Sequence, residues 1–223
     1  MFELRELQPL INRATEASHG RQRTIIGLTG SPGSGKTTIA KQLVEEINAQ
    51  HGADSEHYAA HLPMDGFHLA NDTLHRLGIH HRKGAIDTFD GWGYLALLKR
   101  VKNETSHTVY APEFDRNFEE GIAGHIAIHP DTKLVVTEGN YLLINREPWS
   151  KIRDVAAEIW FCATPEDERV RRLIGRHQQF GMDYGPAKQW AINVDGANAK
   201  LVEPTKTRTD LIISGETGST REP

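Results

Sequence analysis

Short apolar runs alternate with amphipathic segments along most of the 223-residue chain. The apolar runs are rich in β-prone residues and end at polar or glycine-containing segments, which is typical of buried strands. They predict strands over residues 23–29, 58–62, 134–137, 158–163 and 210–213.

Between these runs, apolar residues recur at helical spacing. This spacing predicts helices over residues 2–18, 36–50, 91–101 and 167–177. Strands that alternate with helices indicate a parallel sheet with helices on both faces. We therefore expect an α/β fold, a three-layer sandwich around a central parallel sheet.

Composition limits the range of partners. With 38% hydrophobic residues the chain can bury a core, and we expect a single domain over residues 1–223 with a flexible tail from 215 to 223. A net charge of −4 offers no basic track for nucleic acid. No apolar run approaches the ~18 residues of a membrane span, and the first residues lack a signal-peptide pattern. We expect no nucleic-acid or membrane partner and a cytoplasmic location.

A complete G-x-x-x-x-G-K-[ST] motif lies between the first predicted strand and the first predicted helix. Backbone N–H groups of such a loop point at a phosphate, and the helix start adds partial positive charge. We expect Lys36 to reach the β- and γ-phosphates and the Thr37 hydroxyl to bind Mg²⁺. The predicted nucleotide-binding residues are Gly30, Ser31, Pro32, Gly33, Ser34, Gly35, Lys36, Thr37 and Thr38.

Two carboxylates follow other strands of the predicted sheet. Ligands of open α/β sheets bind beyond the carboxyl ends of the strands, so Asp65 and Glu138 should lie near the phosphate loop. Asp65 suits the orientation and deprotonation of an acceptor hydroxyl, and Glu138 suits the organisation of Mg²⁺. Carboxylates at these places can also merely cap a turn or helix.

The helix predicted over residues 167–177 carries arginines three and four apart, which share one face. We expect Arg172 and Arg176 to close over the transferring phosphate as part of a small helical lid over residues 168–185. The alternative is a solvated charged face. None of the twelve histidines has the spacing of a zinc site, and among them only His68 is a candidate substrate contact.

With these positions in hand, residues 23–213 resemble the P-loop small-molecule kinases that include uridine kinase, bacterial pantothenate kinase and phosphoribulokinase. The resemblance rests on five segments besides the phosphate loop: MDGFH (64–68), KGAIDTFD (83–90), APEFDR (111–116), EGNYLL (138–143) and VEPTKTRTD (202–210). It implies a P-loop NTPase fold, ATP and Mg²⁺ as cofactors, and a small-molecule acceptor. It also allows a homodimer.

Within these segments, the resemblance makes Asp65 the catalytic base and Asp87 a contact to substrate hydroxyls. Asp115, Arg116 and Tyr141 are further candidate substrate contacts. Carboxylates accept hydrogen bonds from vicinal hydroxyls, which favours a polyhydroxylated or nucleoside-like acceptor. Arg116 either binds a carboxylate or phosphate of that acceptor or pairs with a neighbouring acid.

The chain also departs from the pattern of the family that it resembles. Uridine kinases carry a further lid arginine where this chain has Gln179, Phe180 and Gly181, and an aspartate where it has His177. We therefore favour a sugar or sugar-like acceptor over uridine. A nucleotide-hydrolysing switch is the competing interpretation, but the chain has no Asn-Lys dipeptide for reading guanine, and its Asp-x-x-Gly segment at Asp90 does not end a predicted strand.

Overall fold

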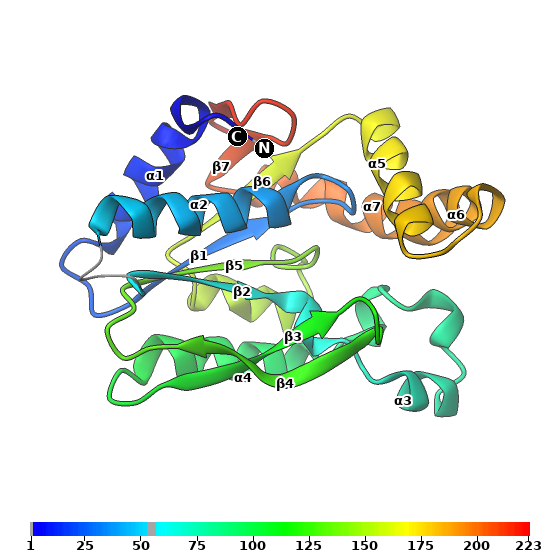
Figure 1. The fold of residues 1–223 in the computed structure, drawn as a ribbon, viewed down its shortest axis with the longest axis horizontal. Coiled ribbons are helices and arrows are strands. Elements are labelled where there is room, and N and C mark those ends of the chain that lie inside the picture. The colour runs from blue at the N-terminus through cyan, green and yellow to red at the C-terminus, as the bar shows by residue number, and fades with distance from the viewer. Residues whose placement is uncertain (1, 53–56) are drawn as a thin grey trace.

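A computed structural model describes residues 2–52 and 57–223 as three layers, with a central sheet between two groups of helices (Figure 1). The strands are β1 Thr24–Thr29, β2 Ala59–Pro63, β3 Val109–Asp115, β4 Glu120–Ile128, β5 Leu134–Glu138, β6 Glu158–Ala163, β7 Leu211–Ser214 and β8 Thr220–Arg221. The helices are α1 Leu4–Ser18, α2 Lys36–His51, α3 Asn71–Arg76, α4 Gly91–Asn103, α5 Glu166–Gln179, α6 Tyr184–Trp190 and α7 Gly196–Val202.

The central sheet has the strand order β2-β5-β1-β6-β7-β8, and its first five strands are parallel. Burial of these strands on both faces explains their continuous apolar sequence. Since parallel strands end at one edge, β1, β2 and β5 deliver the segments that follow them to the same place. Leu28 and Pro63 both pair with Glu138 there.

Each face of the sheet has its own core. On one face, α1 and α2 pack through Leu7, Leu10, Ile39 and Leu43, all fully buried. On the other, α4 packs together with the short 3-10 helix η5, Trp149–Asp154. Figure 1 shows α1 and α2 on the opposite side of the sheet from α4. These two cores hold the strand ends that carry the candidate chemistry.

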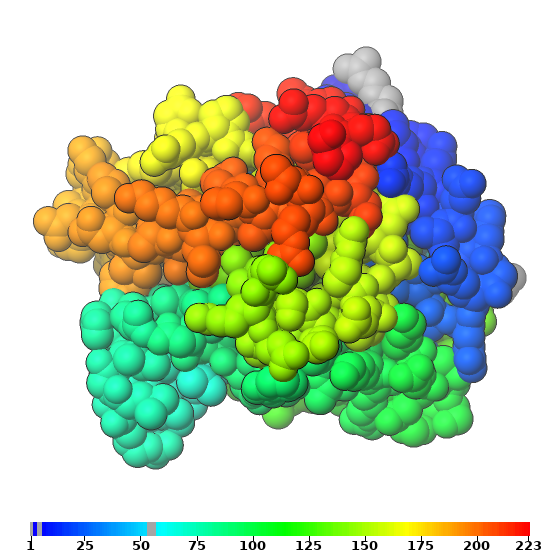
Figure 2. Space-filling view, turned by 180° about the vertical axis from the view of Figure 1, so that it is seen from behind, coloured from blue at the N-terminus to red at the C-terminus, as the bar shows by residue number. Residues whose placement is uncertain are grey.

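Two further parts stand beyond the sheet. Strands β3 and β4 form a separate antiparallel hairpin, and α5, α6 and α7 project together at the end where the strands finish (Figure 1). Seen from behind, the chain around residues 180–200 lies directly above the chain around residues 75–90 (Figure 2). The candidate active site lies between the chain around residues 180–200 and the chain around residues 75–90.

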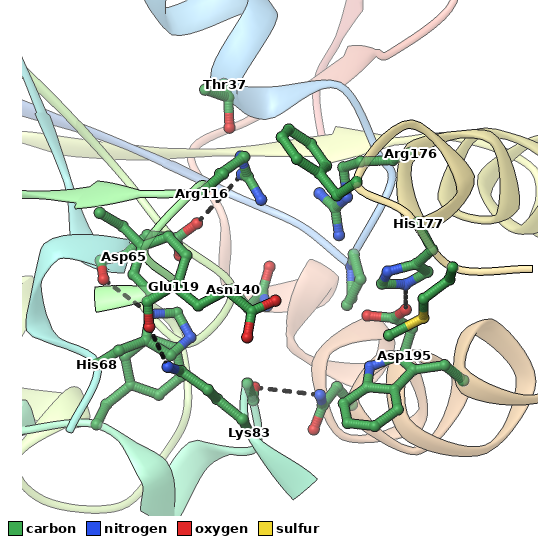
Figure 3. A pocket seen from close by; sticks show the side chains of 18 of the residues that line it. Thr37, Asp65, His68, Lys83, Arg116, Glu119, Asn140, Arg176, His177 and Asp195 are labelled. Atoms are coloured by element: carbon green, nitrogen blue, oxygen red, sulfur yellow. Dashed lines mark hydrogen bonds and ion pairs between the residues drawn. The ribbon is translucent and has the colours of Figure 1, made fainter. Parts of the chain in front are cut away.

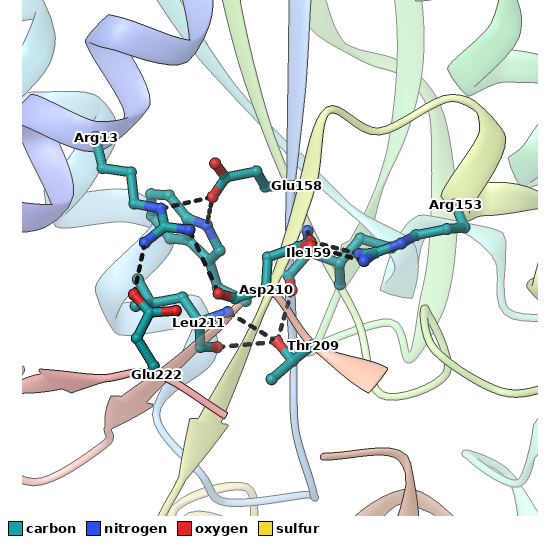
Figure 4. Close-up of polar contacts among 9 residues, drawn as sticks. Arg13, Arg153, Glu158, Ile159, Thr209, Asp210, Leu211 and Glu222 are labelled. Carbon is teal, nitrogen blue, oxygen red and sulfur yellow. Dashed lines mark hydrogen bonds and ion pairs between the residues drawn. The ribbon is translucent and has the colours of Figure 1, made fainter. Parts of the chain in front are cut away.

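At the opposite, amino-terminal edge of the strands a polar network joins four elements (Figure 4). Asp210 accepts hydrogen bonds from the Arg153 guanidinium and from the backbone N–H of Ile159 at 2.7 Å. Arg13 on α1 donates to Glu158 at 2.7 Å. This network fastens α1, β6, β7 and η5 to one another and lies away from the phosphate loop.

The α/β architecture and all five predicted strands are confirmed, with small shifts at their ends. The hairpin of β3 and β4 was not predicted from the sequence, and neither were α6 and α7. The chain after Gly215, for which we expect a flexible tail, turns back in the structure, and β8 pairs antiparallel with β7. Among the described residues, no helix has the length and apolar character needed to span a membrane.

Candidate active site

The phosphate loop connects β1 to α2 with the backbone that its glycines permit. Gly35, which caps α2, has φ of +92°, and Gly33 has φ of +77° with its backbone against the carbonyl oxygen of Arg169. A Cβ at Gly33 would lie 2.8 Å from that oxygen, so a larger residue would shift the loop. The ammonium of Lys36 has no hydrogen-bond or ion-pair partner among the described residues, and it lines a cavity. An unpaired cation there suits a bound anion.

Thr37 and Glu138 contact each other close to Lys36. The Thr37 hydroxyl donates to Glu138 Oε1 at 2.9 Å, and His61 Nε2 lies 3.7 Å from the same oxygen. Burial alone raises the pKa of Glu138, but His61, Lys36 and Thr37 together hold it below its ordinary value. Glu138 is therefore an anion inside the protein.

These oxygens fit Mg²⁺. The ion prefers oxygen ligands and usually takes only one or two from protein side chains, with phosphates and water supplying the rest. No cluster of three or more His, Cys, Asp or Glu side chains that could hold a metal occurs in the described part of the chain. The hydroxyl of Thr37 beside the Glu138 carboxylate thus matches a nucleotide-bound Mg²⁺ better than an all-protein site.

Asp65 lies on the 3-10 helix η2, Met64–Phe67, directly after β2. Its backbone oxygen accepts from His68 Nδ1 at 2.7 Å, and its carboxylate Oδ2 is 3.8 Å from Arg116 Nη2. Burial lowers the pKa of His68, so a neutral imidazole donates through Nδ1 and leaves Nε2 as an acceptor. Asp65, His68 and Arg116 form one wall of the cavity.

Helix α5 supplies the opposite wall. The Arg176 guanidinium has no hydrogen-bond or ion-pair partner in the described residues, and its pKa is lowered by burial first and by the nearby Arg116 charge second. The neighbouring His177 contacts Asp195 with 2.9 Å between Nε2 and Oδ2. Asp195 ends a single π-helical turn, Ala191–Asp195, a distortion that is frequent at functional sites.

The two walls enclose a cavity of about 320 Å³ (Figure 3). In this view Thr37 lies at one end and Lys83 at the other, with the guanidinium groups of Arg116 and Arg176 between them. The predicted residues that line the cavity are Pro32, Lys36, Thr37, Asp65, His68, Arg116 and Arg176. The fold thus brings together side chains from four separate segments of the sequence.

Other predicted residues lie elsewhere. Asp87 is half exposed and pairs with Arg82. Asp115 caps the turn of the hairpin, accepting from the N–H of Asn117 at 2.7 Å. Tyr141 is fully buried, and its hydroxyl donates to the Gly84 carbonyl at 2.6 Å. None of these three side chains lines the cavity, although Tyr141 supports Gly84, which does.

Arg172, Ser31 and Thr38 do not line the cavity. Arg172 donates to Glu168 and, at 3.0 Å, to the carbonyl of Gly215. Hydrogen bonds from Arg171 and Arg172 lower the pKa of Glu168 to about 2. Ser31 donates to Glu203 at 2.5 Å, and Thr38 is exposed. Arg172 therefore lies against the phosphate loop but is already partnered.

Sequence reasoning missed part of the cavity lining. Lys83, Glu119, Asn140, Asp195, Asn198 and Trp190 line it as well. Asn140 and Lys83 belong to segments that carry the family resemblance, so a signal for them was present. Asp195 and Asn198 had none, because they reach the site only through the packing of α6 and the π-helical turn against α5 and of α7 against that turn.

The Asp-x-x-Gly segment has a structural role. Asp90 is the N-cap of α4, and its side chain accepts from the backbone N–H of Gly93 at 2.8 Å. A capping carboxylate satisfies a free N–H at a helix start. This segment therefore offers no support for a nucleotide switch.

The chain is similar to known proteins over nearly its whole length. The sequence profile of the "Phosphoribulokinase / Uridine kinase family" matches residues 25–220. A Schizosaccharomyces pombe protein named "Putative uridine kinase C227.14" is 31% identical over 215 residues, which cover 92% of this chain and 88% of that protein.

Solved structures agree with the fold. The structure titled "putative fructose transport system kinase" from Silicibacter sp. TM1040 has a TM-score of 0.80 at 33% identity, with 89% of this chain and 94% of that chain covered. YFH7 from Saccharomyces cerevisiae, at 20% identity, also has a TM-score of 0.80 over 93% of this chain and 98% of its own, and shares the fold. Because the family profile spans most of the chain and a complete phosphate loop faces the cavity, the chain belongs to the phosphoribulokinase and uridine kinase family and is an ATP-dependent small-molecule kinase.

Proposed function

We propose that the protein transfers the γ-phosphoryl group of ATP to a hydroxyl of a small polyhydroxylated metabolite held in the cavity. One observation carries this proposal: the cations Lys36 and Arg176 and the carboxylate Asp65 line the same cavity. Phosphoryl transfer needs this combination, since charge spreads over the transferred oxygens while the acceptor loses a proton.

The roles follow from the positions. The acceptor hydroxyl oxygen bonds to the γ-phosphorus, the bond from that phosphorus to the β-γ bridging oxygen breaks, and ADP leaves with the bond electrons. Asp65 orients the hydroxyl and takes its proton. Lys36 and Arg176 stabilise the charge on the phosphoryl oxygens from two sides. Closure of the lid, which we place over residues 168–185, excludes water.

The nucleotide would lie along the loop. Thr37 and Glu138 would hold Mg²⁺, which neutralises phosphate charge when bound. A second hollow is lined by the end of β6, by the 3-10 helix Glu203–Arg208 and by β7 and β8, with Thr164, Glu203 and Lys206 among its residues, and offers a place for the base.

Relatives support a hydroxyl-bearing acceptor. Their printed names include a uridine kinase and a fructose transport system kinase. The lid end of this chain has Phe180 beside Arg116, with 5.8 Å between the ring centroid and the guanidinium carbon. This aromatic contact, at the position where uridine kinases carry a further lid arginine, favours a sugar-like acceptor over uridine.

The test is ADP release from ATP and Mg²⁺ with a panel of acceptors. The panel contains free sugars, polyols, sugar acids, sugar phosphates, nucleosides and pantothenate, and one reaction contains no acceptor. A kinase releases ADP above the acceptor-free rate with at least one member. Release that is equally fast without any acceptor would contradict the proposal and support a nucleotide hydrolase.

The matched variants are Asp65→Asn and Asp72→Asn. The amide in Asp65→Asn cannot take the hydroxyl proton, so kcat should fall roughly 10²- to 10⁴-fold while ATP binding by calorimetry stays close to wild type. Asp72 is exposed on α3 outside the cavity, and its variant should keep wild-type turnover. If ATP affinity collapses in Asp65→Asn, Asp65 instead belongs to the nucleotide or metal site.

A further inference from the structure

Apart from Lys36 and Arg176, Arg116 is the cation lining the cavity whose N–H donors have the fewest acceptors. Its side chain is 40% exposed, it lies over the Phe180 ring, and among the described residues the one carboxylate within 4 Å of it is Asp65, with 3.8 Å between Nη2 and Oδ2. A guanidinium has five N–H donors in a planar fork that fits a carboxylate or phosphate. Most of these donors therefore lack an acceptor within the described residues.

Other charged side chains of the cavity have either a partner within the protein or an assigned role in the reaction. Asp195 Oδ2 lies 2.9 Å from His177 Nε2. Lys83 donates to Asn71 Oδ1 at 2.6 Å and to the backbone oxygen of Glu119, whose carboxylate charge also stabilises the ammonium. Lys36 and Arg176 are assigned to the transferred phosphoryl group. Arg116 is therefore the cavity cation to which no anion has been assigned.

During catalysis the Arg116 charge would be neutralised even less. In the absence of acceptor, the Asp65 carboxylate faces Arg116 (Figure 3). When Asp65 turns to an acceptor hydroxyl and takes its proton, it can no longer neutralise Arg116. The nearby Arg176 charge makes an uncompensated Arg116 less favourable still. An anion delivered together with the hydroxyl would remove this cost.

We infer that the acceptor is itself an anion: a small hydroxy compound whose carboxylate or phosphate group binds the Arg116 guanidinium while its hydroxyl binds Asp65. The inference rests on the proposed kinase activity and names the substrate class of the same site. The cavity volume of about 320 Å³, shared with the transferred phosphoryl group, suits an acceptor of sugar size.

Matched acceptor pairs test this charge requirement. Each pair differs in one anionic group: glycerate and glycerol, ribonate and ribitol, gluconate and glucitol, ribose 5-phosphate and ribose. The first three pairs probe a carboxylate and the last probes a phosphate. For at least one pair, the anionic member should have a kcat/KM roughly 10- to 100-fold above its neutral partner, mainly through a lower KM.

The variants are Arg116→Met, Arg116→Lys and the control Arg146→Met. Arg116→Met should bring the anionic-to-neutral ratio of kcat/KM close to one, and Arg116→Lys should restore part of it. A merely structural role would lower the rates with both members of a pair and leave the ratio unchanged. Arg146 is exposed outside the cavity, so its variant should retain the wild-type ratio.

A binding measurement decides the case in which no panel member is phosphorylated. With Mg²⁺ and a non-hydrolysable ATP analogue present, anionic members should raise Tm more than their neutral partners, and Arg116→Met should remove the difference. Equal effects of both members in every pair overturn the inference. Failure of the kinase proposal differs visibly, since ADP release would then be independent of every acceptor.

Discussion

At the scale of single residues, the site depends on charges that have no partner inside the protein. The Arg176 guanidinium lies half-buried at the edge of the cavity without a counter-ion in the described residues, and burial, followed by the nearby Arg116 charge, lowers its pKa. Arg171, five positions earlier on the same helix, is largely exposed and forms a two-pronged ion pair with Glu168. Helix α5 thus carries one arginine without a counter-ion, Arg176, and one that forms an ion pair on the surface, Arg171.

These two arginines give a matched prediction. Arg176→Ala should lower kcat by roughly 10²-fold or more with a smaller change in the KM for ATP, because this cation acts mainly on charge that develops during transfer. Arg171→Ala should leave both constants near wild type. Steady-state kinetics checks this, and an unchanged kcat in Arg176→Ala would assign Arg176 to the solvated face of α5.

At the scale of elements, the hairpin of β3 and β4 positions the 3-10 helix that carries Asp65. The two approach so closely that a Cβ on Gly66 would lie 2.3 Å from the Pro112 carbonyl oxygen. From the other strand, a Cβ on Gly121 would lie 2.6 Å from the Gly66 carbonyl oxygen. Glycines on both sides therefore allow backbone to pack on backbone, and the hairpin sets where Asp65 and Arg116 meet.

Gly66→Ala should break this packing. Because the added methyl group meets backbone rather than a flexible side chain, we expect a destabilisation of roughly 1–3 kcal/mol and a higher KM for the acceptor. The control is Gly185→Ala on α6, where the added Cβ meets nothing within 4 Å. Gly185→Ala should be neutral or slightly stabilising. Urea unfolding with the acceptor assay distinguishes them, and equal stability of the two variants would contradict the packing argument.

At the scale of the whole molecule, the candidate active site and a stabilising polar network lie at opposite edges of the central sheet. The carboxyl edge holds the phosphate loop, Glu138 and Asp65, whereas the amino edge holds the Arg13, Arg153 and Asp210 network (Figure 4). Arg23, 4% exposed, reinforces the amino edge by donating to five backbone carbonyls, among them those of Val101 and Thr132. Ligand binding at one edge can therefore stabilise the molecule without rearranging the other.

Nucleotide binding should be visible in the stability of the entire domain. At about 100 times its Kd, ATP with Mg²⁺ should stabilise the fold by about 2.7 kcal/mol. For a chain of this size that is a rise in Tm of roughly 5–10 °C. Chelation of Mg²⁺ by EDTA should reduce the rise, because Thr37 and Glu138 would lose the ion that links them to the phosphates.

Lys36→Ala extends the same measurement. It should reduce the Tm rise with ATP and lower turnover at least ~10³-fold, since one preorganised cation at the developing phosphate charge is lost. Lys41→Ala, on the exposed side of α2, is the control and should behave as wild type. Full turnover by Lys36→Ala at equal folded content would contradict the phosphate-loop assignment.

The sequence by itself determined the sheet, the phosphate loop and the strand ends. Buried parallel strands leave continuous apolar runs, and the phosphate loop needs glycine, lysine and threonine at set positions, so both are local signals. Because parallel strands end at one edge, Lys36, Asp65 and Glu138 could be predicted to meet.

Only the tertiary structure decided which other side chains share the cavity. Asp87 and Asp115 look like acceptor ligands in the sequence, but local partners hold them, Arg82 for one and a turn backbone for the other. Asp195 and Asn198 reach the cavity because α6 and the π-helical turn Ala191–Asp195 pack against α5 and α7 packs against that turn, contacts that have no short-range signature. The hairpin escaped prediction because β4 is mostly exposed and lacks a buried apolar face. Long-range packing, which local patterns do not encode, therefore set the side of the cavity where we propose that the acceptor binds.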